Sequence, residues 1–444
     1  MVHVVVISPP FASHAAPLAA LGAALRDAGA RVDLASTAAF APLAAGAGIG
    51  FTELAVARNA NHGVAERTRQ DPAEAARLRE FLTATSRGAV ETLLTQAAHR
   101  RADLLAEPDR VLADIRALHR RLQPDWYLVD QLAYPATLAL HCLGLPYASF
   151  CPGHPSYIPA GPDAYFGVPY AWPDTVRPTA EALVRLTRAA ADNDRAFTAA
   201  FHRVIDRNAP HRPRPDRAFA LSSPRAVVHN YPELPWLPAP STGAAALRCG
   251  HCTQPPAPLA EPWTGVADGL TAGGRPLVLL ALGTFLSARH DVLATVADGV
   301  LRHTSAGLVV AAGDRVGEVS SALAASGAPA ERFHVADRIP QQALLTRASA
   351  MVHHAGNNSF TECLAAGVPV LALPFSSDQF AIAHDLERAD VGLSLDPNAL
   401  TADTAGRAVE RLLTRDRSAN DAVRAAVLRR GPDWAAGQLL RLMR

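Results

Sequence analysis

The stretch HHAGNNSFTECLAAGVPVLALPFSSDQF, residues 353–380, decides the fold class of this 444-residue chain. Its pattern predicts a strand ending at His353, a turn through Gly356, a helix that Ser359 caps and Gly367 closes, and then a second strand. Strand, helix and strand in this order form the repeating unit of a parallel sheet covered by helices. The stretch therefore predicts an α/β protein.

The same alternation of strands and helices is predicted on both sides of this stretch. In the first half, strands are predicted at 2–7, 32–35, 126–129 and 147–150, with a long helical region over 72–122 that is interrupted near Pro108. In the second half, they are predicted at 277–282, 307–311, 333–335, 350–353 and 368–373. A chain of this length exceeds one ordinary core. We therefore expect two doubly wound, Rossmann-like domains that face each other across an inter-domain cleft.

Proline content places the boundary between the two domains. Residues 232–263 contain eight prolines and are predicted to be a stiff, extended linker. The predicted units are an N-terminal domain over 1–231, this linker, and a C-terminal domain over 264–425. A final helix over 426–444 is expected to pack back toward the N-terminal domain.

Composition excludes several classes of function. A net charge of +1 gives no basic field for nucleic acid or an anionic membrane. The chain has no lysine, which excludes a Walker-type phosphate loop and a Schiff base. Five scattered cysteines argue against a disulfide framework and for a reducing, cytoplasmic setting. No apolar run reaches the ~18 residues that would suggest a membrane span, and the N-terminus does not read as a signal peptide.

The opening stretch carries side chains suited to a charged ligand. A helix N-terminus presents free N–H groups and a partial positive charge, so the turn before it can hold a phosphate. Gly356 would let the backbone approach closely, and His354 could donate a hydrogen bond. After the next strand, Asp378 and Gln379 offer paired acceptors and donors of the kind that grip a polyol such as a sugar. Helix capping by Ser359 and Asp378 explains each residue singly about as well.

In combination, these residues resemble the donor-binding signature of the GT-B, UDP-glycosyltransferase-like enzymes, including bacterial enzymes that decorate natural products. The pattern His-x-Gly-x-x-Ser-x-x-Glu, Gly-x-Pro and Pro-x-x-x-Asp-Gln is met in 354–379, and segments 279–285 and 339–345 resemble further parts of that family. The resemblance implies a donor site without a metal or cofactor. Its residues would be Thr284, His354 and Ser359 at the diphosphate, with Gly283, Gly356 and Asn358 beside them; Glu362 at the ribose; Arg338, Ile339 and Gln341 at the base; and Asp378 and Gln379 at the sugar.

Three positions depart from the family's pattern. Arg338 stands where the family usually has a tryptophan that stacks on uracil; a guanidinium can also stack on a base. Ala281 replaces the usual serine before Gly283, and Ile382 stands where an asparagine is common. The base of the nucleotide is therefore left open between uracil and thymine.

The N-terminal half supplies a candidate for proton transfer. His14 lies in the predicted loop after the first strand, at the carboxyl end where an active site belongs, and the spacing of His14 and Pro17 resembles the family's acceptor-side base. Asp130 ends a later strand of the same domain and would fix the tautomer of that histidine. The loop over 151–175 is rich in aromatic residues, and His154 and Tyr157 are candidate acceptor contacts, although loop packing explains them equally well.

Two further motifs predict no chemistry here. The CGHC sequence at 249–252 lies inside the proline-rich segment, without the following helix that a disulfide oxidoreductase needs. The pair also lacks a second pair at zinc spacing. The DND sequence at 192–194 lies in a helical pattern and is typical of a solvated face.

The leading expectation is a cytoplasmic, inverting, metal-independent hexosyltransferase that acts as a monomer or homodimer. It would move a sugar from a UDP- or dTDP-sugar to a hydroxyl of a small natural-product-type acceptor, as in antibiotic biosynthesis. The alternatives are a sugar-nucleotide epimerase or hydrolase on the same fold, and a non-catalytic accessory protein of the same shape. A working acid–base pair in the N-terminal half favours the transferase.

Overall fold

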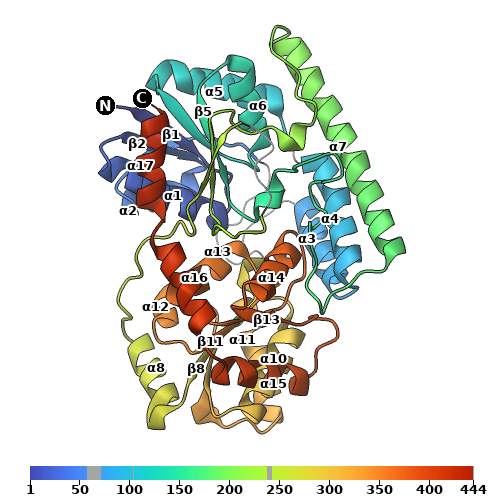
Figure 1. Cartoon of the computed structure of the whole chain (residues 1–444), viewed down its shortest axis with the longest axis vertical. Helices are drawn as coiled ribbons and strands as arrows, with labels where there is room; N and C mark the ends of the chain where they lie inside the picture. The colour runs from blue at the N-terminus through green and yellow to red at the C-terminus, as the bar shows by residue number, and fades with distance from the viewer. Residues whose placement is uncertain (58–71, 104, 238–242, 444) are drawn as a thin grey trace.

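The computed structural model describes residues 1–57, 72–103, 105–237 and 243–443. These residues form two α/β units, which lie one above the other in Figure 1. All neighbouring strands in both sheets are parallel, so helices must cross between them on either face. The predicted fold class, two doubly wound domains, is confirmed.

The N-terminal sheet has the strand order β3-β2-β1-β4-β5-β6-β7. The order reverses between β1 and β4, which are hydrogen-bonded neighbours, so this is the topological switch point of the sheet. The strands are β1 (His3–Ile7), β2 (Arg31–Ser36), β3 (Gly50–Glu53), β4 (Trp126–Asp130), β5 (Tyr147–Cys151), β6 (Ala226–His229) and β7 (Ala245–Arg248). Its helices are α1 (Ala12–Asp27), α2 (Ala41–Gly46), α3 (Pro72–Thr85), α4 (Ala89–Asp103), α5 (Pro108–Leu122), α6 (Tyr134–Leu143) and α7 (Ala180–Asn208).

The C-terminal sheet has the order β10-β9-β8-β11-β12-β13, and its switch point lies between β8 and β11. The strands are β8 (Leu277–Ala281), β9 (Gly307–Ala311), β10 (Phe333–Ala336), β11 (Ala350–His353), β12 (Val370–Ala372) and β13 (Gly392–Ser394). Its helices are α8 (Trp263–Thr271), α9 (Gly283–Leu286), α10 (His290–His303), α11 (Val316–Ala325), α12 (Gln341–Leu345), α13 (Asn357–Ala366), α14 (Gln379–Arg388), α15 (Ala402–Thr414) and α16 (Ser418–Leu428).

The last helix, α17 (Pro432–Leu442), returns to the N-terminal sheet and packs beside α1 (Figure 1). Its residues Ala435 and Leu439 are buried in one cluster with Leu18 and Leu21 of α1. The chain therefore passes between the two sheets twice, once before β8 and once between α16 and α17, which limits how far the two units can separate.

The predicted linker over 232–263 needs correction, because part of it is a strand. β7 lies within this segment and pairs with β6 at the edge of the N-terminal sheet. The eight prolines flank residues 243–254 without entering them, so the ladder keeps its N–H donors there. Leu247 is buried against the same cluster as α17, which gives the strand an apolar contact. The connection between the sheets follows β7.

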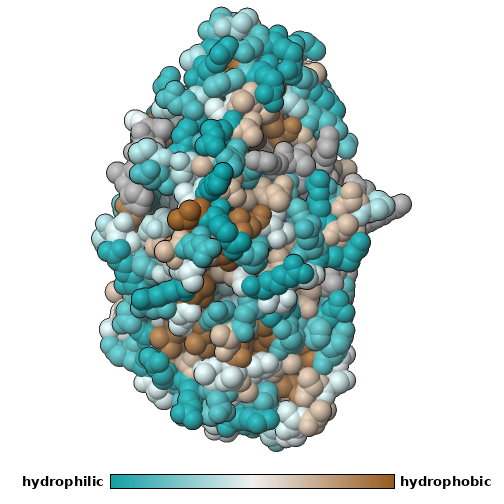
Figure 2. Space-filling view, turned by 90° about the vertical axis from the view of Figure 1, so that its right-hand side faces the viewer, coloured by the Kyte–Doolittle hydropathy of each residue, from teal (hydrophilic) through white to brown (hydrophobic). Residues whose placement is uncertain are grey.

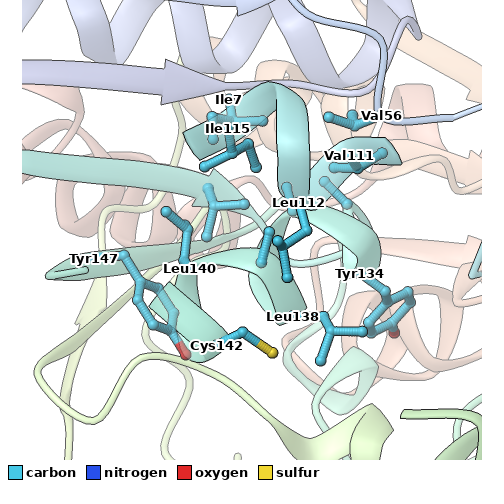
Figure 3. Close-up of a cluster of buried hydrophobic side chains, with 14 of the residues drawn as sticks. Ile7, Val56, Val111, Leu112, Ile115, Tyr134, Leu138, Leu140, Cys142 and Tyr147 are labelled. Atoms are coloured by element: carbon cyan, nitrogen blue, oxygen red, sulfur yellow. The ribbon is translucent and has the colours of Figure 1, made fainter. Parts of the chain in front are cut away.

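Each sheet carries apolar clusters on both faces. Figure 3 shows the cluster under α5 and α6, where Val111, Leu112 and Ile115 of α5 pack toward Ile7 of β1. Ile115 follows Val111 by four residues and Leu112 by three, so the three side chains share one helix face. Burying each such side chain contributes about 1.5–3 kcal/mol. The outer face in Figure 2 is mostly hydrophilic, with hydrophobic residues in small groups. No helix in the described part of the chain is long and apolar enough to cross a membrane.

Candidate active site

The two switch points face one cavity of about 500 Å³ between the domains. The N-terminal side of its lining includes Phe11 and His14, which follow β1. The C-terminal side includes Thr284, which follows β8, and His354, which follows β11. Ligands in doubly wound folds bind at these positions because the carboxyl ends of the strands leave a crevice there. The expected inter-domain cleft is therefore present.

His14 and Asp130 form a hydrogen-bonded pair across the N-terminal switch point. The Nδ1 atom of His14 lies 2.9 Å from Oδ2 of Asp130, and the other carboxylate oxygen accepts the backbone N–H of Leu132 at 2.8 Å. A carboxylate only accepts, so in the neutral ring Nδ1 carries the proton and Nε2 has the lone pair. The Asp130 side chain is fully buried, whereas that of His14 is 18% exposed and lines the cavity. This geometry suits a histidine that accepts a proton from a ligand.

The structure corrects the position of His14, which was expected in a loop. Helix α1 begins at Ala12, so His14 lies in its first turn. Pro17 lies inside the helix and has no N–H to donate to the Ser13 carbonyl one turn earlier. The side-chain amide of Asn358 donates to that carbonyl instead, at 2.8 Å. Because Pro17 cannot bond to it, the Ser13 carbonyl of the N-terminal domain is free to accept from the C-terminal domain, directly beside the candidate base.

Helix α13 also begins earlier than expected. Gly356, and not Ser359, is its N-cap residue, and a glycine has no side chain that could cap the helix. The turn forms because Ala355 adopts a left-handed φ of 60° while its N–H donates to Nδ1 of His353 at 2.9 Å. Ser359 occupies the third helical position, so its N–H is still among those without an intrahelical acceptor. The helix cap predicted at Ser359 is therefore absent.

The first turn of α13 is tied to the N-terminal domain by asparagines. The Asn357 side chain donates to the carbonyls of Pro152 at 2.8 Å and Asn230 at 2.7 Å. The Asn230 side chain in turn donates to Oδ1 of Asn358 at 3.1 Å. These bonds are buried or partly buried and join three segments that are distant in sequence. They hold the positive end of α13 in the wall of the cavity.

His354 lies between two glycines at this helix N-terminus. A Cβ on Gly283 would come within 2.6 Å of its Cε1, and a Cβ on Gly356 would overlap the ring. Burial lowers the pKa of His354 to about 4, so the ring is neutral at physiological pH. Its Nδ1 is buried and has no hydrogen-bond partner among the residues that the structure describes. An orphaned buried donor or acceptor beside a helix N-terminus fits an anionic group of a ligand.

The other predicted donor residues of this region form a separate cluster. Gln341 donates to Glu362 at 2.6 Å and to Ser359 Oγ at 3.1 Å, and Gln342 donates to the other oxygen of Glu362 at 2.9 Å. Burial raises the pKa of Glu362. Arg338 is exposed and Ile339 packs partly against the C-terminal core. These residues lie together beside α13 and do not line the cavity.

Asp378 and Gln379 line the cavity, but the protein already uses much of their bonding capacity. The Oδ1 of Asp378 accepts the Tyr157 hydroxyl at 2.9 Å, and Oδ2 accepts the His154 N–H at 2.9 Å. The Oε1 of Gln379 accepts the N–H groups of Phe375 and Ser376 at 2.8 and 3.1 Å. Gln379 thereby fixes the turn that presents Asp378.

Of the two candidate acceptor contacts, only Tyr157 lines the cavity. His154 is 1% exposed, and its Nε2 lies 3.1 Å from Oδ2 of the fully buried Asp385. That carboxylate also accepts from Tyr231 and Trp236, both at 2.8 Å. His154 therefore belongs to the packed domain interface and does not reach an acceptor.

Sequence reasoning missed the contribution of α4 to the cavity. Gln96 and Arg100 both line it, and the Gln96 side chain bonds to Ser377 next to Asp378. The two residues lie one helical turn apart in a segment whose pattern predicts only a helix, so no motif marks them. Among the described residues, no group of three or more His, Cys, Asp or Glu side chains could hold a metal ion.

Comparison of the whole chain with solved structures decides the fold family. The glycotransferase of kitacinnamycin superposes with a TM-score of 0.67 over 100% of this chain and 99% of that one, at 19% identity. The glycosyltransferase VinC, solved with dTDP, gives 0.64 over 99% of each chain, at 20% identity. The chain has the GT-B fold. The resemblance expected from residues 354–379 is thus confirmed over the full length of the GT-B chain.

Sequence comparison supports the C-terminal half in particular. Residues 319–430 match the C-terminal domain of the erythromycin biosynthesis protein CIII-like family. Demethyllactenocin mycarosyltransferase of Streptomyces fradiae is 29% identical over 169 residues, 38% of this chain and 33% of that protein. The NDP-glycosyltransferase YjiC of Bacillus licheniformis is 30% identical over 142 residues, 32% of this chain and 34% of that protein. This GT-B chain spans about a third of the length of the curated relatives it matches.

Proposed function

We propose that this GT-B protein is an inverting glycosyltransferase that moves a sugar from a nucleotide diphosphate to a hydroxyl of a small, largely apolar acceptor. The observation that carries the proposal is one cavity with two unlike walls. One wall has His14 with Nε2 unprotonated and Nδ1 bonded to Asp130. The other has the N-terminus of α13 with the neutral His354.

The reaction would be a single displacement. His14 Nε2 takes the proton of the acceptor hydroxyl, and the oxygen attacks the anomeric carbon of the sugar as the bond to the diphosphate oxygen breaks. Asp130 stabilises the imidazolium that forms. The leaving diphosphate develops charge against the free N–H groups of α13, with Thr284 and His354 beside it, and this electrostatic stabilisation needs no metal. Attack from the face opposite the leaving group inverts the anomeric centre.

The donor assignment rests on the C-terminal half and its relatives. VinC was solved with dTDP, and the spinosyn rhamnosyltransferase SpnG was solved with thymidine diphosphate and, separately, with the spinosyn aglycone. These neighbours support a dTDP-sugar donor and an aglycone acceptor here, and a UDP-sugar stays the alternative donor. Asp378 and Gln379 would contact the sugar, Glu362 the ribose, and the segment from Arg338 to Gln341 the base.

A thermal-shift titration with UDP, dTDP and GDP sugars tests the proposal. We expect a UDP- or dTDP-sugar to raise the melting temperature at sub-millimolar concentration, and the GDP sugar to have no effect. Incubation with an acceptor panel then separates the alternatives. A transferase forms a glycoside, whereas an epimerase or hydrolase changes the donor without any acceptor. An accessory protein does neither, and that result would overturn the proposal.

A further inference from the structure

Among the described residues, Arg100 has no ion-pair partner, and it lies in the cavity wall. It comes from α4, lines the cavity and has its guanidinium carbon 4.6 Å from the centroid of the Phe166 ring. That cation–π contact offers no hydrogen-bond acceptor. No hydrogen bond or ion pair of the Arg100 side chain is present within the described part of the chain. The other cavity arginine differs, because Arg77 pairs with Glu74 at 2.9 Å.

The nearest cavity carboxylate does not neutralise Arg100 by contact. Asp378 acts on it through space, but its two oxygens accept from Tyr157 and His154 and no ion pair forms with Arg100. Burial lowers the pKa of Arg100, since the protein excludes part of the water that would solvate its charge. A guanidinium remains charged in proteins, so the positive charge stays in the cavity wall.

A ligand that fills the cavity displaces the remaining water from this guanidinium. If the ligand were neutral there, it would leave a buried charge with five donors and no anion, which is strongly unfavourable. A carboxylate matches the planar fork of the guanidinium with two parallel hydrogen bonds. We propose that the acceptor carries a carboxylate, and that this carboxylate pairs with Arg100. This inference rests on the proposed function and names the class of acceptor.

Part of the N-terminal lining agrees with an acid that has an apolar body. Phe11, Leu132, Pro135 and Phe166 line this side of the cavity and offer contact area but no donors from their side chains, beside the polar Glu74, Arg77, Gln96 and His99. His14 supplies the point where a hydroxyl is deprotonated. The acceptor would therefore be a hydroxylated, mostly apolar carboxylic acid that is held at two points, by Arg100 and by His14.

Binding of matched acids and esters tests the inference on the whole chain. The probes are 4-hydroxycinnamic acid and deoxycholic acid, each with its methyl ester, titrated by calorimetry into the wild type, Arg100→Met, Arg100→Lys and Arg116→Met. Arg116 is an exposed arginine on α5 and controls for the loss of one positive charge. We expect at least one acid to bind the wild type tenfold or more tightly than its ester. That preference should fall below twofold in Arg100→Met, be intermediate in Arg100→Lys and persist in Arg116→Met.

Equal affinity of acid and ester, absence of binding by both pairs, or a preference that survives Arg100→Met would overturn the inference. The carboxylate could instead belong to the donor, so UDP-glucose and UDP-glucuronic acid are compared in the same variants. If Arg100→Met selectively lost affinity for UDP-glucuronic acid, the carboxylate would belong to the donor sugar, and that result would also overturn the inference. Because these are binding measurements, their failure differs from failure of the proposed function, which is the absence of glycoside formation and of nucleotide binding.

Discussion

The two switch points have the same topology and different chemistry. At the N-terminal switch point, His14 at the start of α1 is bonded to the buried carboxylate of Asp130, which ends β4, and this pair can take and hold a proton. At the C-terminal switch point, two glycines and the neutral His354 follow β8 and β11 beside a helix N-terminus, and this arrangement suits an anion. In the proposed mechanism, equivalent places in two similar folds therefore have different roles. Proton transfer would belong to the N-terminal domain and charge stabilisation to the C-terminal domain.

The largest expected effect comes from the N-terminal switch point. His14→Ala should lower the turnover number by about 10²- to 10⁴-fold, because the acceptor hydroxyl loses its base. Asp130→Asn should have a comparable effect, since an amide can donate to Nδ1 and place the proton on Nε2. Steady-state transfer assays measure both variants. Turnover within tenfold of the wild type in His14→Ala would remove the histidine from the mechanism.

A smaller effect on a different parameter is expected at the C-terminal switch point. Gly356→Ala places a methyl group against the ring of His354 and should raise the dissociation constant of the nucleotide diphosphate by tenfold or more. Gly437→Ala on α17 is the matched control, because a Cβ there meets no other atom within 4 Å. Equal nucleotide affinity in both variants would show that the turn at Gly356 takes no part in binding the nucleotide diphosphate.

The contact between the two switch points should have a modest effect that depends on Pro17. Asn358→Ala removes the donor to the Ser13 carbonyl and should lower kcat/KM by about two- to tenfold, the range of one hydrogen bond. In a Pro17→Ala background, the new N–H of residue 17 can bond to that carbonyl, so Asn358→Ala should cost less. A double-mutant cycle of transfer rates measures the difference, and strict additivity would contradict this role of the proline.

The smallest effect concerns stability in acid. Burial lowers the pKa of His353 to about 3 and that of His354 to about 4, below the ~6.5 of an unfolded histidine. Between pH ~6.5 and about 4, the unfolded chain binds more protons than the folded chain. The stability gained from keeping the two histidines neutral is therefore fully present above pH ~6.5 and is lost as the pH falls toward 4. His353→Asn should reduce the slope of the unfolding free energy against pH by about 1.4 kcal/mol per pH unit. Denaturant unfolding from pH 4 to 7 measures it, with the exposed His290→Asn as control, whose slope should stay that of the wild type.

The sequence predicted the sheets well because their strands are continuous apolar runs with turn residues at both ends. Strands at 307–311 and 350–353 agree with β9 and β11 at both ends. β3, β6, β7 and β13 were missed. β3 and β13 each contain a single large apolar residue and so give a weak strand pattern, and β7 lay among prolines.

The candidate site was predictable where a residue follows the carboxyl end of a strand, as for His14 and His354. It was not predictable where tertiary contacts set the geometry. The start of α13 moved from Ser359 to Gly356, whose turn depends on His353 accepting a backbone N–H. For His154 an acceptor contact and loop packing both stayed open, because loop aromatics give no sign of a buried partner such as Asp385. Arg100 belongs to no sequence motif that would have pointed to the site.

One calorimetric titration tests the division of labour most directly. UDP or dTDP, whichever stabilises the wild type, is titrated into His14→Ala. If the N-terminal switch point only transfers a proton, the dissociation constant should stay within about twofold of the wild-type value while transfer is lost. A tenfold or greater loss of nucleotide affinity would mean that His14 holds the donor, and it would contradict the separation of the two chemistries between the two domains.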